Sequence, residues 1–319
     1  MFIDWLSITV PGDTPSVLDR LHSYFGDWEV LDYGGSGYEC SAKIGDTGRV
    51  FWNTERKDMG VHVKLPASAL KALPRDAVTV LCDLVAMGGK ASRLDLAADD
   101  FEGLLDMNLM RDKVLRGEFL CRAHNGREER SLFGEDGHTL YFGSRRSDTL
   151  LRIYDKKAEQ ASQKVDVSFC ESWVRVESEL KGDRADGAAQ YIAQHPETWF
   201  IEAAGWLLDF LDFKDPGTDS NVSRWDTSDW WSTFVERAKK ARIVSVQEER
   251  TVEDVKAWVE KQVTPSLFVL EATVGHEEVF HMVAEGSGRL NDRHKKMIED
   301  YNKSLRELYP REVEDVAEA

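Results

Sequence analysis

Three segments of this 319-residue chain alternate apolar and charged residues with a period of two, which is typical of half-buried β-strands. They lie at residues 92–99, 149–157 and 173–180. Each segment predicts one apolar face toward a core and one polar face. The residues expected on the polar faces are Arg93, Asp95, Asp99, Arg152, Tyr154, Lys156, Arg175, Glu177 and Glu179.

The order of the expected elements repeats along the chain. Residues 1–90 read as a strand, a helix, several strands and a helix, and residues 91–205 follow the same order. Residues 139–157 read as a β-hairpin around the polar turn SRRSD. We therefore expect an α+β fold of antiparallel sheets with helices packed on one face, built from two related halves.

The C-terminal part of the chain has a different pattern. Residues 212–224, DFKDPGTDSNVSR, read as an exposed linker, and residues 218–319 as a helical region. The tryptophans of this region recur at helical spacing, so they are interpreted as core residues.

Charge and composition limit the classes of protein. The formal net charge of -17 argues against a surface that binds nucleic acid everywhere, so any phosphate-binding surface must be local. No stretch is long and apolar enough to span a bilayer, and the N-terminal segment does not resemble a signal peptide. The 4 cysteines form no C-x-x-C pair and are expected to be reduced. These features predict a cytoplasmic protein without a membrane partner.

The charged faces allow two interpretations. If the three strands are neighbours, their acidic residues could hold Mg²⁺ or Mn²⁺, because hard cations prefer oxygen ligands. The Tyr154 phenol between the cations Arg152 and Lys156 could then act as a nucleophile in phosphoryl transfer. The other interpretation is a solvated sheet face with cross-strand ion pairs.

The chain closely resembles the replication initiation factor family of rolling-circle plasmids and filamentous phages, which also contains relaxases of integrative conjugative elements. Three segments carry the resemblance: RLDLAADD, TLYFGSRRSDTLLRIYDKKAEQ and WVRVESELKGDRA. It is strong for residues 92–189 and looser for DWLSITV, SRWDTSDWW and VEKQVTPSL. The resemblance implies a core like that of two-histidine (HUH) nucleases. The paired histidines are missing, and His62-x-Lys64, the nearest candidate, is interpreted as structural.

The resemblance also implies a reaction and a set of site residues. Such initiators nick one strand at an origin, which leaves a 5′-phosphotyrosine link and a free 3′-hydroxyl. Residues 1–90 would serve DNA recognition or structure, and residues 91–205 would be catalytic. Asp100 could substitute for its neighbour Asp99. The implied roles are nucleophile for Tyr154, supporting cations for Arg152 and Lys156, metal ligands for Asp95, Asp99 and Glu177, and DNA contacts for Arg145, Arg146, Lys157 and Arg175.

Several alternatives remain at this point. Tyr141 is a rival nucleophile, although it lacks the flanking cation pair. The histidines of HEEVFH, residues 276–281, are five apart and do not share a helix face as zinc ligands would. The expected partners are origin DNA, single-stranded or hairpin, with a host helicase and a second copy of the chain as further candidates. The alternative functions are a relaxase of an integrative mobile element and a non-catalytic DNA-binding homologue.

Overall fold

The computed structural model describes residues 1–26, 28–132, 137–240 and 259–290, together with the scattered positions 252, 256, 295, 297–299 and 301–303. It divides into two compact units, Met1–Arg242 and Ile243–Ala319.

The first unit contains the two related halves that the sequence predicts. The first half consists of β1 (Phe2–Val10), α1 (Thr14–Phe25), β2 (Glu29–Leu31), β3 (Cys40–Ile44), β4 (Gly48–Trp52), η1 (Lys57–Met59), β5 (Val61–Pro66), α2 (Ala67–Ala72) and α3 (Ala77–Ala86). The second half consists of β6 (Lys90–Asp100), α4 (Met107–Arg116), β7 (Phe119–Cys121), β8 (Gly126–Arg130), β9 (His138–Phe142), β10 (Thr149–Asp155), α5 (Lys156–Ser162), β11 (Val174–Lys181) and α6 (Gly182–Gln194).

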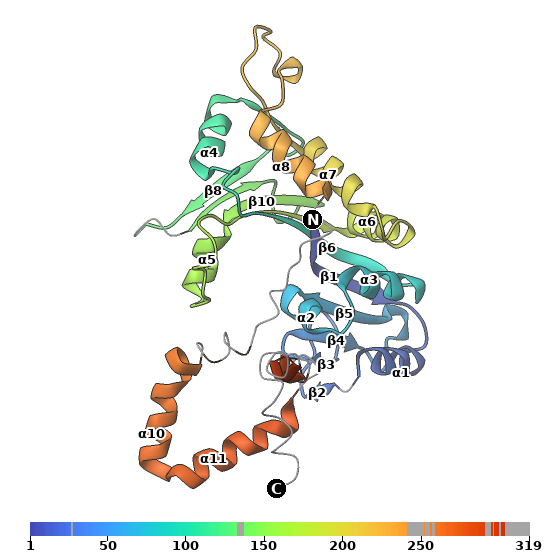
Figure 1. Cartoon of the computed structure of the whole chain (residues 1–319). Helices are drawn as coiled ribbons and strands as arrows, with labels where there is room; N and C mark the ends of the chain where they lie inside the picture. The colour runs from blue at the N-terminus through green and yellow to red at the C-terminus, as the bar shows by residue number, and fades with distance from the viewer. Residues whose placement is uncertain are drawn as a thin grey trace. The chain divides into compact units, whose positions relative to one another are not determined.

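Both halves contribute to one antiparallel sheet of 10 strands in the order β2-β3-β4-β5-β1-β6-β11-β10-β9-β8. The first strands of the two halves, β1 and β6, pair at the centre, and each half extends outward from this junction (Figure 1). The predicted α+β class, the antiparallel pairing and the duplication are therefore confirmed.

The hydrophobic core lies on one face of this sheet. Inward-facing residues such as Leu6, Leu94 and Ile153 are fully buried there, as the period-two pattern predicts. Helices α3 and α6 lie along this face, and so do α7 (Trp199–Phe210) and α8 (Asp229–Lys240) (Figure 1). Helix α5 contributes no buried residue to this core and lies on the other side of β10 from α4 and α8 (Figure 1).

The remaining elements close the first unit and form the second. The first unit also holds β12 (Leu211–Phe213), which pairs with β7, and η2 (Val222–Arg224). The second unit holds η3 (Val259–Val263), α10 (Thr264–Val274), α11 (His276–Glu285) and η4 (Gly286–Arg289). Beyond residue 290 the predicted helical region 218–319 falls largely outside the described residues. None of the described helices combines the length and the apolar composition that crossing a bilayer requires.

The predicted domain boundaries remain predictions. The sheet runs without interruption from the first half into the second, and α8, which falls within the predicted range 218–319, packs against α7 in the first unit.

Candidate active site

Tyr154 lies on the polar face of β10, between β9 and β11. Its hydroxyl donates a hydrogen bond to Glu177 Oε2 at 3.1 Å. Arg152, two residues earlier on the same face, pairs with the other oxygen of Glu177 through Nη2. Directly opposed positions on β10 and β11 explain this arrangement, since Arg152 faces Glu177 and Tyr154 faces Arg175. The side chains of Tyr154 and Glu177 are both buried.

Two cations flank the Tyr154 ring. The Arg152 guanidinium lies 5.7 Å from the ring centroid, and Lys156 Nζ lies 5.6 Å from it. Lys156 does not continue the strand as its alternation predicts, because β10 ends at Asp155 and α5 begins at Lys156. The Asp155 carboxylate caps this helix by accepting a hydrogen bond from Ala158 N at 2.8 Å. The helix start still places the ammonium beside the tyrosine, where it also pairs with Glu159.

The phenol is strongly held in its protonated form. Burial, reinforced by the negative charge of Glu177, raises the pKa of Tyr154 well above its usual range. Arg175 and Arg152 oppose this shift but do not outweigh it. Nucleophilic attack therefore requires that the proton be removed as the substrate binds.

Arg175 forms a second ion-pair group on the same face. It donates to Asp99 through Nε at 2.6 Å and Nη2 at 2.9 Å, and to Asp4 through Nη1 at 2.9 Å. Arg175 is only 3% exposed, so contact with a DNA phosphate would need this pairing to open. Asp100, the predicted substitute for Asp99, lies on the core face and accepts hydrogen bonds from Glu102 N and Leu105 N.

A third ion-pair group centres on Arg93. It makes two hydrogen bonds to Asp95, at 2.9 and 2.6 Å, and Nη2 lies 2.9 Å from Glu179 Oε2. Lys181 pairs with the other oxygen of Glu179 at 2.6 Å. Burial, together with the carboxylates of Glu177 and Glu179, raises the pKa of Asp95 to about 7 although Arg93 opposes the shift.

The donor set agrees in part with the predicted metal site. Asp95 and Glu177 are buried oxygen donors on one face, and the pKa of Asp95 is raised by burial first and then by the charges of Glu177 and Glu179; a divalent cation would favour the charged carboxylates. Asp99 stands apart from them, paired with Arg175. Within the described part of the chain, no three His, Cys, Asp or Glu side chains stand together in a metal-binding arrangement. Binding would thus need Arg93 and Arg152 to release their carboxylates.

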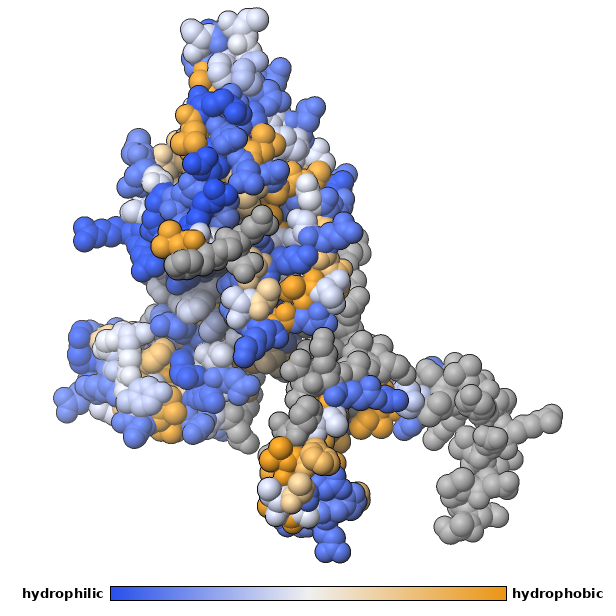
Figure 2. All heavy atoms as spheres, turned by 90° about the vertical axis from the view of Figure 1, so that its left-hand side faces the viewer, coloured by the Kyte–Doolittle hydropathy of each residue, from blue (hydrophilic) through white to orange (hydrophobic). Residues whose placement is uncertain are grey.

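The other predicted DNA contacts lie farther from the hydroxyl. Arg145 and Arg146 are exposed in the turn that precedes β10, whereas Tyr154 is near the end of that strand. Lys157 is on α5, where Nζ donates to the carbonyl oxygen of Glu171 at 3.0 Å. Figure 2 shows that hydrophilic side chains predominate over one side of the molecule, with hydrophobic ones in small groups.

The rival candidates have other contacts. The Tyr141 hydroxyl donates to Glu129 at 3.1 Å and its ring lies under Arg127, so it points away from Glu177. His62 is buried, bonds to Thr9 and stacks on Tyr38, which agrees with a structural role. His276 and His281 are exposed and pair with separate glutamates.

Two contributors were missed in the sequence. Asp4 reaches Arg175 from β1, and Glu159 reaches Lys156 from the first turn of α5. Lys156 and Glu159 are three residues apart, and this spacing predicts an ion pair if the segment is a helix. Asp4 could be found only once β1 was known to pair with β6.

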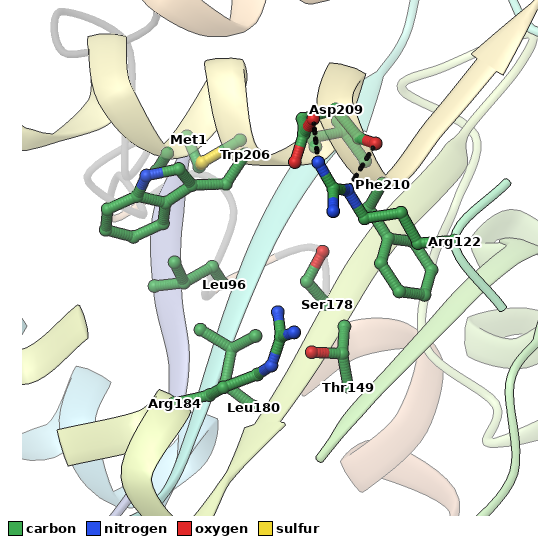
Figure 3. Close-up of a pocket in the computed structure, with 12 residues that line it drawn as sticks. Met1, Leu96, Arg122, Thr149, Ser178, Leu180, Arg184, Trp206, Asp209 and Phe210 are labelled. Atoms are coloured by element: carbon green, nitrogen blue, oxygen red, sulfur yellow. Dashed lines mark hydrogen bonds and ion pairs between the residues drawn. The ribbon is translucent and has the colours of Figure 1, made fainter. Parts of the chain in front are cut away.

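A pocket of about 120 Å³ lies on the opposite face of the sheet (Figure 3). Leu96 and Ser178 point into it from the core side of β6 and β11, and Arg122 bonds to Asp209 at its rim. None of the predicted site residues lines this pocket. The candidate site is therefore the open polar face and not an enclosed cavity.

Comparisons with known proteins identify the family of this chain. The family model described as replication initiation factor matches residues 89–283, more than half of the chain. The chain belongs to the replication initiation factor family. The match covers the whole polar face of the second half, including the strands that carry Asp95, Tyr154 and Glu177.

Two related sequences and one solved structure support this family assignment. A Bacillus subtilis (strain 168) protein designated as a DNA relaxase, NicK, is 27% identical over 79% of this chain and 75% of its own length. A replication initiation protein of Staphylococcus aureus is 40% identical over 30% of this chain and 27% of its own length. The solved structure of a rolling circle replication initiator protein from Geobacillus stearothermophilus is 27% identical, with a TM-score of 0.66, and the match covers 76% of this chain and 97% of that one.

Proposed function

We propose that this chain is a rolling-circle replication initiator that nicks one DNA strand through Tyr154. Family membership and the likeness to a solved initiator support the nicking function. The hydrogen bond from Tyr154 to Glu177 supports the choice of nucleophile because both side chains are buried, whereas Tyr141 bonds to the exposed Glu129.

In the proposed reaction Tyr154 Oη attacks the scissile phosphorus, and the bond from phosphorus to the 3′ oxygen breaks. The 5′ end stays on the enzyme as a phosphotyrosine, and the leaving 3′ oxygen takes up a proton. The carboxylate of Glu177 accepts the phenolic hydrogen bond, so it is the group placed to take the tyrosine proton. Arg152 and Lys156 flank the ring and would offset the charge of the phosphate.

The metal is part of the proposal. Asp95, Asp99 and Glu177 are the residues proposed to hold Mg²⁺ or Mn²⁺, with Asp95 and Glu177 the better fit. Such a cation would polarise the scissile phosphate. The DNA phosphate would compete for Arg152 and Arg93 and so release these carboxylates for the cation.

Origin DNA is the proposed substrate, as single-stranded or hairpin DNA. A host helicase, a second copy of the chain and a cytoplasmic location remain predictions. Arg145, Arg146 and Lys157 are proposed to contact the DNA backbone outside the site.

The test is cleavage of single-stranded origin oligonucleotides with Mn²⁺ and with a chelator. We expect a covalent adduct with the wild type and with Tyr141→Phe, and none with Tyr154→Phe or after chelation. An adduct that persists in Tyr154→Phe would exclude the assignment, and one that survives chelation would exclude the metal.

A relaxase of an integrative mobile element is the second candidate, favoured by the 79% of the chain that aligns with NicK. The chemistry would be the same. Gene neighbours that encode transfer machinery would favour the relaxase, and phage coat or plasmid replication genes the initiator. A non-catalytic homologue would give no metal-dependent cleavage on any hairpin-bearing substrate.

A further inference from the structure

The strand pairing shows which residues of the first half occupy positions equivalent to residues of the second half. At the junction Leu6 pairs with Leu94, and the pairing shifts at one extra residue on each side, Asp4 in β1 and Ser92 in β6. The distance along the sequence from Asp4 to Ser92 equals that from Leu6 to Leu94, so the bulges occupy equivalent positions in the two halves. The helices α2 and α6 likewise begin directly after β5 and β11. Ser7 in the first half is thus the counterpart of Asp95 in the second.

The strands next to β1 and β6 show which residues of the first half stand in the place of the proposed catalytic residues. Ser7 pairs with Lys64 and Thr9 with His62, where the second half pairs Asp95 with Glu179 and Ala97 with Glu177. His62 therefore stands in the place of Glu177, and Lys64 in the place of Glu179. One strand farther out, Phe51 stands opposite His62 as Arg152 stands opposite Glu177. The counterpart of Tyr154 is Asn53, which has no nucleophilic group.

The polar face of the first half carries a basic residue, Lys64, in the place of the acidic Glu179, and further basic residues on the next two strands. Lys43 is opposite Arg49, Arg49 is opposite Lys64, and Lys64 is opposite Ser7. The three basic side chains form one row across β3, β4 and β5, with roughly 4.8 Å between neighbouring strands. We call Lys43, Arg49 and Lys64 the basic row.

The cations of the basic row have few acidic partners. No described acidic side chain lies within ion-pairing distance of Arg49 or Lys64, and Lys43 has only the fully exposed Asp46 at 3.9 Å. Arg49 donates to the carbonyl of Gly48, and Lys64 donates to Ser36 at 3.2 Å. In the second half, by contrast, Arg93, Arg152 and Arg175 are all paired with carboxylates. In a chain of net charge -17, this leaves a local excess of positive charge on the same face of the sheet as Tyr154.

We propose that the first half is a catalytically silent copy of the second whose basic row binds the phosphate backbone of the DNA strand beside the scissile phosphate. The row requires no metal, because its positive charge comes from side chains. Sequence would not be read there, since phosphate contacts position the strand without identifying bases. This inference rests on the proposed function, which supplies the DNA.

The test measures binding without chemistry. A labelled single-stranded origin oligonucleotide is titrated with Tyr154→Phe protein at several salt concentrations, with and without Arg49→Gln/Lys64→Gln. The matched control is Arg20→Gln/Arg184→Gln, which removes the same charge from exposed positions on α1 and α6, two helices that pack against the core. Arg49→Lys/Lys64→Arg keeps the charge.

We expect Arg49→Gln/Lys64→Gln to weaken binding about tenfold at moderate salt. It should lower the slope of log affinity against log salt by about 1.4, since each phosphate contact on single strands contributes about 0.7. The loss should be equal for origin and scrambled sequences. The matched control and the Arg49→Lys/Lys64→Arg variant should bind DNA as tightly as the Tyr154→Phe protein that carries no further substitution.

An unchanged slope in the folded Arg49→Gln/Lys64→Gln protein would overturn the inference, and so would an equal loss in the control pair. If Arg49→Gln/Lys64→Gln fails to fold by circular dichroism, Lys43→Gln gives the same test with an expected slope change of about 0.7. Adduct formation by the wild type is measured separately. If the wild type forms the adduct but the salt slope of Arg49→Gln/Lys64→Gln is unchanged, the role of the basic row is rejected and the nicking function is still supported.

Discussion

The contact between Tyr154 and Glu177 serves two purposes at the scale of single residues. It orients the phenol oxygen, and the charge of Glu177 adds to the effect of burial in raising the pKa of the phenol. The alternation of the sequence was enough to place Arg152 and Tyr154 on one face, but not to show which carboxylate each would contact. Partners in a sheet depend on register, which a single sequence does not reveal.

Replacing Glu177 should mainly affect the chemical step. Glu177→Gln removes the proton acceptor for Tyr154, and general-base groups typically contribute about 10²- to 10⁴-fold to a rate. We expect adduct formation at saturating DNA to slow by at least about 10²-fold. Glu179→Gln is the matched control, because Glu179 pairs with Lys181 and Arg93 and not with Tyr154. Equal losses in the two variants would argue against a special role for Glu177.

His62 should make the fold sensitive to mild acid. Burial, and then the charge of Lys64, lowers its pKa to about 4 in the folded protein, against an ordinary value of 6.5. Between these values the unfolded chain binds a proton that the folded one does not, so stability is lost as the pH falls. From pH 7 to pH 5 this loss should be on the order of 1–2 kcal/mol. Urea titrations of His62→Phe should show a weaker fall over that range, and an unchanged fall would contradict the assignment.

At the scale of elements, strand ends and helix starts position the reactive groups. Lys156 was predicted on the strand face, yet it reaches Tyr154 from the first turn of α5, because the Asp155 cap ends β10 there. The strand alternation continues through Lys156 in the sequence, and it conceals the helix cap at Asp155.

The α5 cap can be tested against another cap in the same half. Asp155→Ala removes the hydrogen bond to Ala158 N, and Asp106→Ala removes those to Asn108 N and Leu109 N at the start of α4. Each should cost about 1 kcal/mol of unfolding free energy. Only Asp155→Ala should also slow adduct formation, since α5 carries Lys156. Similar cleavage rates in both variants would show that the α5 start does not matter for the chemistry.

At the scale of the whole molecule, the junction of β1 and β6 joins the halves into one sheet. The sequence repeat allowed two halves to be predicted, but not that their sheets would be continuous. Edge pairing between β1 and β6 has no sequence signature, because both strands simply read as half-buried. The continuity places Asp4 of the first half in the ion-pair group of Arg175.

A continuous sheet should unfold as one cooperative unit. Leu6 and Leu94 are fully buried at the junction, so Leu6→Ala or Leu94→Ala should cost about 2–5 kcal/mol. Hydrogen exchange should then accelerate together for amides of β3 in the first half and β10 in the second. Acceleration confined to the half that carries the substitution would show that the halves unfold independently.

The most direct measurement is the position of the covalent bond to DNA. Wild-type protein is trapped on a single-stranded origin oligonucleotide with Mn²⁺, digested, and the nucleotide-bearing peptide is sequenced by mass spectrometry. The account predicts a phosphotyrosine at Tyr154, carried by the 5′ end of the cleaved strand. A nucleotide on Tyr141 or on any other residue would contradict it.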